Sequence, residues 1–168
     1  MFSRIFFNLS YLWSAPRDRF KLLFWYLWFT LKYLFINRVW KIKWDSAGFL
    51  GFRVIFPSWW RFYYLFECLF VQREYWFQVD ASPSSGEPAG NYKPRIIDGG
   101  SNIGLSVLYF NYLYPEAEIL AFEPEPETFA VLRENVERNG LKRVYLFNFA
   151  LGRERGEIEF YAVSYTHL

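Results

Sequence analysis

The segment that most constrains the fold is a glycine-rich loop between a short apolar strand and a helix. Arg95–Asp98 (Arg-Ile-Ile-Asp) is predicted as the strand, and the loop Gly99–Gly104 (Gly-Gly-Ser-Asn-Ile-Gly) follows it directly. Ile103–Leu113 is predicted as a mostly apolar helix that ends before Pro115. Glycine permits the sharp turn that such a junction needs and lets a ligand approach the main chain. This succession predicts the first unit of an α/β fold.

The alternation of strand and helix continues after this loop. A strand (Glu118–Phe122), a helix (Pro126–Arg138) and two more strands (Val144–Phe149 and Glu157–Val163) are predicted in chain order from apolar runs and helical spacing. Asn139-Gly140 stops the helix, because both residues tolerate a left-handed backbone. The pattern predicts a Rossmann-like, mostly parallel α/β sheet.

A smaller unit is predicted ahead of the loop. Phe49–Phe56 is predicted as a strand that forms one arm of a small hairpin, with Gly48 and Gly51 as turn signals. Trp59–Val71 has apolar residues at helical spacing, and Tyr75–Val79 is predicted as a short strand. These elements indicate an α+β extension that leads into the parallel sheet.

Basic and aromatic residues are concentrated in the first part of the chain. Residues 1–61 carry ten Lys/Arg and two Asp, whereas residues 62–168 carry nine Lys/Arg and fifteen Asp/Glu. Leu22–Ile36 is nearly all apolar and has Lys/Arg on both sides, but at 15 residues it is shorter than the ~20 of a membrane-spanning helix. Two interpretations stay open: a helix that lies in the membrane interface and a helix buried in the protein.

These observations divide the chain into four predicted parts. They are a basic, aromatic-rich helical segment (1–48), a strand and helix lead-in (49–80), a linker rich in Pro, Gly and Ser (81–94) and an incomplete Rossmann-like domain (95–168).

Composition excludes several classes of site. A single cysteine, Cys68, excludes an internal disulfide and a cysteine zinc cluster, and it is predicted to be a core thiol. A single histidine, His167, argues against histidine metal sites and Ser-His-Asp catalysis. No zinc finger, helix-turn-helix or RNA-binding signature is present, so we expect no nucleic-acid partner. Glu67 is predicted to be hydrogen-bonded or solvated, and Asn135 to be a helix-surface or capping residue.

Two acidic residues mark a candidate ligand site. Asp98, at the end of the first strand, can accept hydrogen bonds from a ligand's amine or hydroxyl groups. The second strand ends in Glu123-Pro124, where an acid lies beside the first loop and can accept both hydroxyls of a ribose. The dinucleotide fingerprint is absent, because Ser101 or Asn102 stands where its third residue must be glycine, and no Walker sequence follows. The spacing Asp-x-Gly-x-x-x-Gly is instead the form seen in S-adenosylmethionine-dependent methyltransferases.

The sequence resembles one methyltransferase family in particular. Residues 94–162 are similar to the first half of the FkbM-type methyltransferase domain, a class I, Rossmann-like family, and the lead-in from residue 49 extends the similarity. The matching stretches are Ile-Ile-Asp-Gly-Gly-Ser-Asn-Ile-Gly (96–104), Ala-Phe-Glu-Pro-Glu-Pro (121–126), Leu-Arg-Glu-Asn-Val-Glu-Arg-Asn-Gly (132–140), Phe-Ala-Leu-Gly (149–152) and, in the lead-in, Glu-Cys-Leu-Phe (67–70) and Glu-Tyr-Trp-Phe (74–77).

The resemblance implies an S-adenosylmethionine site built from three strand ends. The first would hold the methionine moiety, the second the ribose and the third the adenine. The residues implied are Asp98, Gly99, Gly100, Ser101, Asn102 and Gly104 for the methionine moiety, Glu123 and Pro124 for the ribose, and Asn148 and Ala150 for the adenine. No metal is implied.

The chain departs from the family pattern in its extent. The family has more strands than the four predicted after the linker, and the later strand with a Lys-Asp-x-Glu-Gly-like motif is missing. A general base and most substrate contacts would lie there, so no catalytic residue is assigned. Residues 163–168 break the strand pattern, and we therefore expect a C-terminally truncated fragment.

The expected function is methyl transfer from S-adenosylmethionine to a hydroxyl of a sugar or another small molecule, in the cytoplasm. Peripheral membrane contact through residues 1–48 is a further hypothesis, and the oligomeric state stays open. The alternative from another class is a non-catalytic membrane-surface or partner-binding protein with a vestigial nucleotide pocket. An NAD-dependent oxidoreductase is a third interpretation, weakened by Ser101 in place of glycine.

Overall fold

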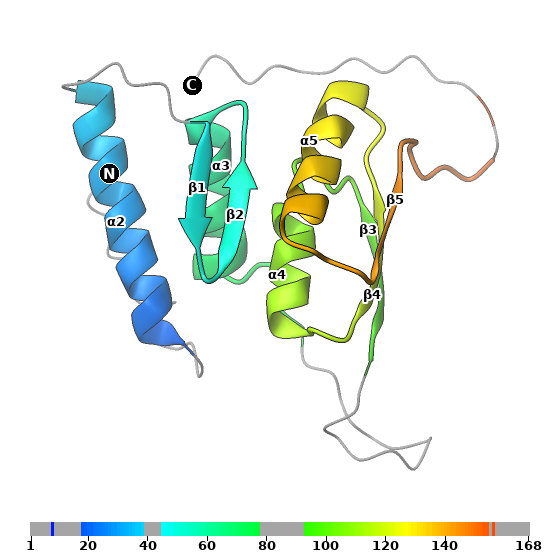
Figure 1. Cartoon of the computed structure of the whole chain (residues 1–168), viewed down its shortest axis with the longest axis horizontal. Helices are drawn as coiled ribbons and strands as arrows, with labels where there is room; N and C mark the ends of the chain where they lie inside the picture. Colours follow the sequence, from blue (N-terminus) through cyan, green and yellow to red (C-terminus); the bar gives the residue numbers. More distant parts are fainter. Residues whose placement is uncertain (1–7, 9–17, 39–44, 78–92, 155, 157–168) are drawn as a thin grey trace, which may run out of the picture.

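The computed structural model describes residues 8, 18–38, 45–77, 93–154 and 156, and it arranges their helices and strands in successive layers (Figure 1). A helix, α2, lies beside a β-hairpin backed by a short helix; two further helices follow, and then a sheet. In chain order the elements are α2 (Arg19–Arg38), β1 (Ser46–Phe49), β2 (Phe52–Ile55), α3 (Trp59–Phe66), the π-helix η1 (Glu67–Val71), β3 (Arg95–Gly99), α4 (Leu105–Leu113), β4 (Glu118–Phe122), α5 (Pro126–Arg138) and β5 (Val144–Phe147).

The sheet formed by β3, β4 and β5 is parallel, with β4 in the centre. Parallel neighbours need crossover connections, and α4 and α5 provide them. Both helices lie on the same side of the sheet in Figure 1, where Ile96 and Asp98 are buried. On the other face Ile97 and Tyr145 keep 64% and 49% of their surfaces exposed. The prediction of an α/β fold with a parallel sheet is confirmed.

Most predicted elements of this sheet are observed with small shifts at their ends. Glu118–Phe122 and Pro126–Arg138 have the predicted bounds. The helix α4 begins two residues later than predicted, because Gly104 still has a left-handed backbone with φ of +89°. β5 ends at Phe147, two residues earlier than predicted. The predicted strand Glu157–Val163 lies outside the described residues.

The hairpin differs from its prediction in one respect. Phe49–Phe56 is not a single strand, because the chain turns at Leu50 and Gly51, whose φ angles are +50° and +89°. Both arms therefore lie within residues 46–55, and Gly48 pairs with Arg53 inside the hairpin instead of forming its turn. Gly51 is the turn glycine, as predicted.

The lead-in helix is confirmed over Trp59–Val71, with its last five residues as the π-helix η1. The predicted strand at Tyr75–Val79 is wrong for its described part. Arg73 has a φ of +58°, and Trp76 N donates to Arg73 O at 2.9 Å, so the chain turns there. Residues 78–79 lie outside the described part of the chain.

An aromatic core joins α2 to the lead-in. The Phe29 ring of α2 lies edge-on to the rings of Phe49 and Phe66, with centroid distances of 6.0 and 4.9 Å. Such edge-to-face pairs are favourable because a positive ring edge meets a negative ring face. The core therefore continues across residue 48, and the interpretation of Leu22–Ile36 as a buried helix holds for the face that carries Leu22, Tyr26 and Phe29.

Glu67 lies within this packing, with 1% of its surface exposed. Asn8 donates a hydrogen bond to its Oε1, and the Tyr26 hydroxyl lies 3.5 Å from the same oxygen. The prediction of a hydrogen-bonded Glu67 is therefore confirmed. Burial raises the pKa of Tyr26, and the nearby Glu67 charge adds to the effect.

Two asparagines, Asn135 of α5 and Asn139 at its C-cap, hold the hairpin against the parallel sheet unit. Ile55 N donates to Asn135 Oδ1 at 2.8 Å, and Asn135 Nδ2 donates to Ile55 O at 3.0 Å. Asn139 makes the same pair of bonds to Arg53, both at 2.8 Å. Four helical residues rise about 6 Å and two strand residues about 6.6 Å, so the two amides match alternate residues of the strand edge. Asn135 Nδ2 also lies 2.8 Å from Ile103 O.

Asn135 was expected on a helix surface or at a cap, and that expectation is wrong. Its side chain is fully buried and joins α5, β2 and the end of the glycine-rich loop.

We predict that Asn135→Ala lowers the free energy of unfolding by about 1–3 kcal/mol, because it leaves buried backbone groups without partners. Urea unfolding followed by circular dichroism measures this. Glu137→Ala, exposed on the same helix, is the control and should change stability by less than about 0.5 kcal/mol. Equal effects would contradict the assignment.

Candidate cofactor site at the strand ends

The glycine-rich loop is fixed to the end of the neighbouring strand. Gly100, Asn102 and Gly104 have φ angles of +95°, +50° and +89°, so the backbone is left-handed at every second residue. Gly100 N and Ser101 N both donate to Phe122 O, at 2.8 and 2.9 Å. The loop therefore folds over the carboxyl end of β4, where ligands bind in open parallel sheets.

The backbone N–H groups of this loop are already paired within the protein. After Gly100 and Ser101, Asn102 N donates to Glu123 Oε2 at 2.9 Å. Ile103 N donates to Asn102 Oδ1 at 2.8 Å, and Gly104 N donates to Ser101 O at 2.8 Å. Loops that bind phosphate aim such N–H groups at the anion. With all five donors from residue 100 to 104 already engaged, this loop is unsuited to cradling a phosphate.

Glu123 is held in place by two backbone donors and keeps further acceptor capacity. Its side chain has 7% of its surface exposed, Oε2 accepts from Asn102 N, and Oε1 accepts from Glu125 N at 3.0 Å. A carboxylate has about four acceptor positions, so one remains on each oxygen. That arrangement suits a ligand with two neighbouring hydroxyl groups.

Glu125 fixes the start of α5 beyond this acid. Its carboxylate caps the helix by accepting from Thr128 N and from Glu127 N, the latter at 3.1 Å. The hydrogen bonds from Thr128 hold the pKa of Glu125 below its ordinary value. The cap and Pro126 at the first helical position together set where the Glu123-Pro124 segment turns away from the sheet.

Asp98 faces α4 at the end of β3. It is buried, and Ser106 Oγ donates to its Oδ2 at 2.6 Å. Ser101 Oγ donates to the backbone oxygen of the same residue at 3.0 Å. The position of the aspartate is thus set by the first turn of the helix that follows the loop.

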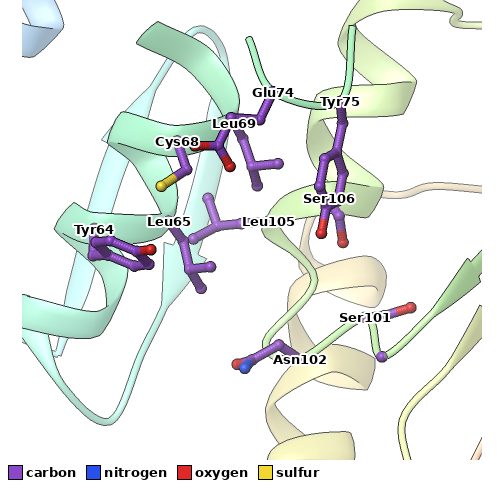
Figure 2. A pocket seen from close by; sticks show the side chains of 11 residues that line it. Tyr64, Leu65, Cys68, Leu69, Glu74, Tyr75, Ser101, Asn102, Leu105 and Ser106 are labelled. Carbon is purple, nitrogen blue, oxygen red and sulfur yellow. The ribbon is translucent and has the colours of Figure 1, made fainter. Parts of the chain in front are cut away.

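A cavity of about 190 Å³ lies between the loop and the lead-in (Figure 2). One wall comes from the loop and α4, and the other comes from α3, η1 and the turn that follows. Tyr64, Leu65 and Cys68 stand across the cavity from Asn102 in Figure 2. The lining residues are Tyr64, Leu65, Cys68, Leu69, Glu74, Tyr75, Gly100, Ser101, Asn102, Leu105 and Ser106.

The cavity has no cationic side chain among its described lining residues, and Glu74 is its charged group. An anionic ligand such as a phosphate requires a donor-rich or cationic wall, which this cavity does not provide. The Glu74 carboxylate attracts a positively charged ligand and repels an anion.

The predicted site residues on the first strand and its loop fall into two groups. Gly100, Ser101 and Asn102 line the cavity, and Asp98 lies behind them, bound to Ser106. Gly104 instead lies against α5, where a Cβ would stand 2.8 Å from Leu132 Cδ1. Because it has no Cβ, the end of the loop can approach Leu132 of α5. A Cβ on Gly99 would stand 3.4 Å from Leu151 Cδ1.

The predicted residues of the other two strand ends are linked to one another. Asn148 Nδ2 donates to Glu123 O at 2.9 Å and to Pro124 O at 3.2 Å. Ala150 is exposed on the same segment, one residue before the Leu151 that faces Gly99. The residues after β5 therefore run beside both Glu123 and the glycine-rich loop.

Sequence reasoning missed the cavity wall that comes from the lead-in, and it missed Ser106. The wall includes Tyr64, Glu74 and Tyr75, and Cys68 lies there as well as being buried as predicted. For Ser106 the available signal was a polar residue in an otherwise apolar segment, whereas Glu74 follows Gln72 and Arg73 and gives no such signal. Nothing local in the sequence shows that the lead-in faces the loop.

Part of the chain is similar in sequence to curated methyltransferases. It is 44% identical over 59 residues to Methyltransferase 1 of Beauveria bassiana, covering 35% of this chain and 24% of that protein. It is 52% identical over 46 residues to Methyltransferase sdnD of Sordaria araneosa, covering 27% and 18%. It is 38% identical over 68 residues to the 2-O-methyltransferase NoeI of Sinorhizobium fredii, covering 40% and 27%. The matches thus span about a quarter of the length of these relatives or less.

Neither family models nor solved structures give a stronger match than these sequences. No family model matches the chain. Among solved structures, the N-terminal domain of human METTL16 in complex with SAH aligns with 70% of this chain and 40% of its own, at 15% identity and a TM-score of 0.34. A TM-score of this size supports no argument about function. The sequence matches place a stretch of this chain among methyltransferase sequences.

We predict that Gly104→Ala destabilises the protein more than Gly100→Ala. Both positions have a φ near +90°, so both substitutions strain the backbone, but a Cβ at Gly100 meets nothing within 4 Å. The Gly104 variant also pushes against the fully buried Leu132, and the added cost should be about 1–3 kcal/mol. Thermal unfolding of the two variants measures the difference. Equal destabilisation would show that strain alone explains the glycine at position 104.

We also predict that the thiol of Cys68, the single cysteine of the chain, reacts slowly with disulfide reagents at neutral pH. Burial raises the pKa of Cys68, so little thiolate is present at neutral pH. Its labelling rate with a disulfide reagent should keep rising with pH beyond ~8.5, where a free thiol levels off. Rates measured from pH 7 to 10, with glutathione as the control, test this. The prediction would be contradicted if the labelling rate of Cys68 stopped rising at the same pH as that of glutathione or at a lower pH.

Proposed function

We propose that the chain is part of an S-adenosylmethionine-dependent methyltransferase of the FkbM type, which transfers a methyl group to a hydroxyl of a sugar or another small molecule. The observation that carries the proposal is a glycine-rich loop whose backbone donors are all paired, beside a cavity wall without cations. The similarity to methyltransferases supports it, and one of these relatives is named a 2-O-methyltransferase.

The residues present fit this cofactor better than a dinucleotide. S-adenosylmethionine has no phosphate. It carries a positive sulfonium group, one ammonium and one carboxylate at the methionine end, and a ribose with two hydroxyls, so its net charge is positive. Glu123 has an acceptor position left on each oxygen, which matches the two hydroxyls. A pyrophosphate would need free N–H groups from residues 100–104, and these are engaged. The fit therefore disfavours the NAD-dependent alternative on physical grounds.

The size of the cavity assigns it to part of the cofactor. Its volume is about 190 Å³, whereas sites that enclose a whole ligand of this size have ~300–1,000 Å³. Gly100, Ser101 and Asn102 would line the space for the methionine end. Glu123, which is not among the lining residues but accepts a hydrogen bond from Asn102 N, would bind the ribose outside the cavity. Asn148, through its bonds to the carbonyls of Glu123 and Pro124, would set the position of the adenine side.

The role of these residues in catalysis is mainly positioning. When bound, S-adenosylmethionine supplies an activated methyl group that moves directly to a nucleophilic oxygen, while the acceptor loses its hydroxyl proton. Glu74, from the wall opposite the loop, provides a negative charge that favours a cation in the cavity. Tyr64 and Tyr75 line the same wall, and each keeps about half of its surface exposed.

We predict that S-adenosylmethionine binds saturably to this chain in calorimetric titration and that Glu123→Ala weakens the binding by roughly tenfold to a hundredfold. The loss corresponds to about 1–3 kcal/mol, as for a charged hydrogen-bond partner. The matched control is Glu127→Ala, an exposed acid on the first turn of α5, which should leave the affinity unchanged.

Three outcomes would count against the proposal. They are a folded chain, by circular dichroism, that binds no S-adenosylmethionine, equal binding of NAD, and equal effects of the Glu123 and Glu127 substitutions. Binding without methyl transfer to any hydroxylated acceptor, in a chain that extends beyond these residues, would favour the alternative of a non-catalytic protein with a vestigial pocket.

A further inference from the structure

The helix α2 has a second apolar face that the described protein does not cover. Leu22, Tyr26 and Phe29 are buried against the lead-in. The exposed residues recur three or four positions apart and so form one stripe along the opposite side of the helix. They are Phe20, Phe24, Leu27, Trp28 and Leu31, with 73%, 59%, 48%, 42% and 49% of their surfaces exposed.

This stripe lies at the outside of the molecule. Figure 1 shows α2 as the outermost layer, with the hairpin and α3 on one side of it and no described element on the other. A helix that is apolar all round is stable only when both faces are removed from water. Aromatic and aliphatic side chains in one contiguous stripe therefore mark an interaction surface and not scattered exposure.

The charges of α2 are all positive. Its sequence contains Arg19, Lys21, Lys32 and Arg38 and no Asp or Glu. The Lys32 ammonium lies 5.1 Å from the centre of the Trp28 ring, and the Arg19 guanidinium lies 5.8 Å from that of Phe20. The cations thus border the apolar stripe, in the manner of interfacial helices whose rings and basic groups meet lipid headgroups.

The charges of α2 distinguish two candidate partners that could cover the stripe, a second copy of the chain and a membrane surface. In a second copy packed face to face, α2 would bring cations against cations without an acid in either helix, which is unfavourable. None of the helices in the described residues is long and apolar enough to cross a membrane. A lipid bilayer with anionic headgroups offers an apolar acyl region to the stripe and negative charge to the basic residues beside it.

We propose that α2 docks in the interface of a membrane that contains anionic lipids. The face with Phe24 and Leu31 enters the acyl boundary, and Arg19 and Lys32 contact the headgroups, whereas Lys21 is paired with Asp18, with 2.9 Å between Nζ and Oδ1. Tyr26 on the opposite face lies 3.5 Å from Glu67 at the start of η1, and η1 also lines the cavity. Docking therefore holds the cavity one helix away from the lipid surface.

The test is flotation of the chain with vesicles of phosphatidylcholine, with and without phosphatidylserine. The chain should float with the anionic vesicles, and high salt should weaken the binding. Phe24→Ser combined with Leu31→Ser should reduce binding by at least about tenfold. The matched control is Ile97→Ser combined with Tyr145→Ser, which removes exposed apolar side chains of similar exposure, 64% and 49%, from the sheet face.

A second variant tests whether reduced vesicle binding is caused by a loss of folding. Arg19→Gln combined with Lys32→Gln keeps the apolar stripe and should weaken binding to anionic vesicles severalfold, with an unchanged circular dichroism spectrum. No flotation of the folded chain, equal loss in the sheet-face control, or concentration-dependent dimers abolished by the Phe24 and Leu31 substitutions would each overturn the proposal. The last result would assign the stripe to a second copy. S-adenosylmethionine binding is a separate readout, so failure here leaves the proposed function standing.

Discussion

The side-chain amide of Asn135 is the interaction on which the candidate site most depends. It pairs with both backbone groups of Ile55 and also reaches Ile103 O at the end of the glycine-rich loop. One buried amide therefore joins α5, the hairpin and the loop, and Asn139 repeats the strand contact one helical turn further on. A buried amide leaves few alternative arrangements, because any shift of the strand orphans several polar groups at once. The lead-in wall of the cavity faces the loop because the hairpin is fixed in this way.

The loop itself shows how the same local geometry can serve different ligands. Glycine-rich turns between a strand and a helix commonly leave backbone donors free for a phosphate. Here Phe122 O, Glu123 and the loop's own oxygens accept those hydrogen bonds. The result is a rigid loop with little remaining attraction for an anion. Selection against phosphate ligands thus comes from internal hydrogen bonds and needs no repulsive charge in the cavity.

Elements with a clear local period could be predicted from the sequence. The strand Glu118–Phe122 and the helix Pro126–Arg138 have an apolar run and a 3.6-residue period, respectively, and both were predicted with their observed bounds. The strand predicted over Phe49–Phe56 failed because an apolar stretch hides a turn at Leu50-Gly51. A left-handed leucine is uncommon, so residue type did not reveal the turn before the glycine.

The tertiary parts of the site could not be predicted, for a different reason. In the sequence, Asn135 resembles an ordinary polar residue of a helix surface, and its amide gains partners because the hairpin and the end of the loop are brought against α5. Likewise, Tyr64 and Glu74 gain a role only because the lead-in folds back on the loop. Gly99, Gly100 and Glu123 could be named as candidates because the strand, the loop and the acid follow one another at fixed spacing. Local chemistry is visible in a sequence, whereas the faces of distant elements are not.

The lead-in has two surfaces that are used differently. Its α3 and η1 helices present one side to the cavity and another to α2, so the aromatic core between them links the site to the outermost helix. The contacts between α2 and the lead-in include edge-to-face pairs of Phe29 and one stacked pair, Tyr33 with Tyr63. The helices that line the cavity are therefore the same ones that bury the inner face of α2, so whatever covers its outer face lies one helix away from the cavity wall.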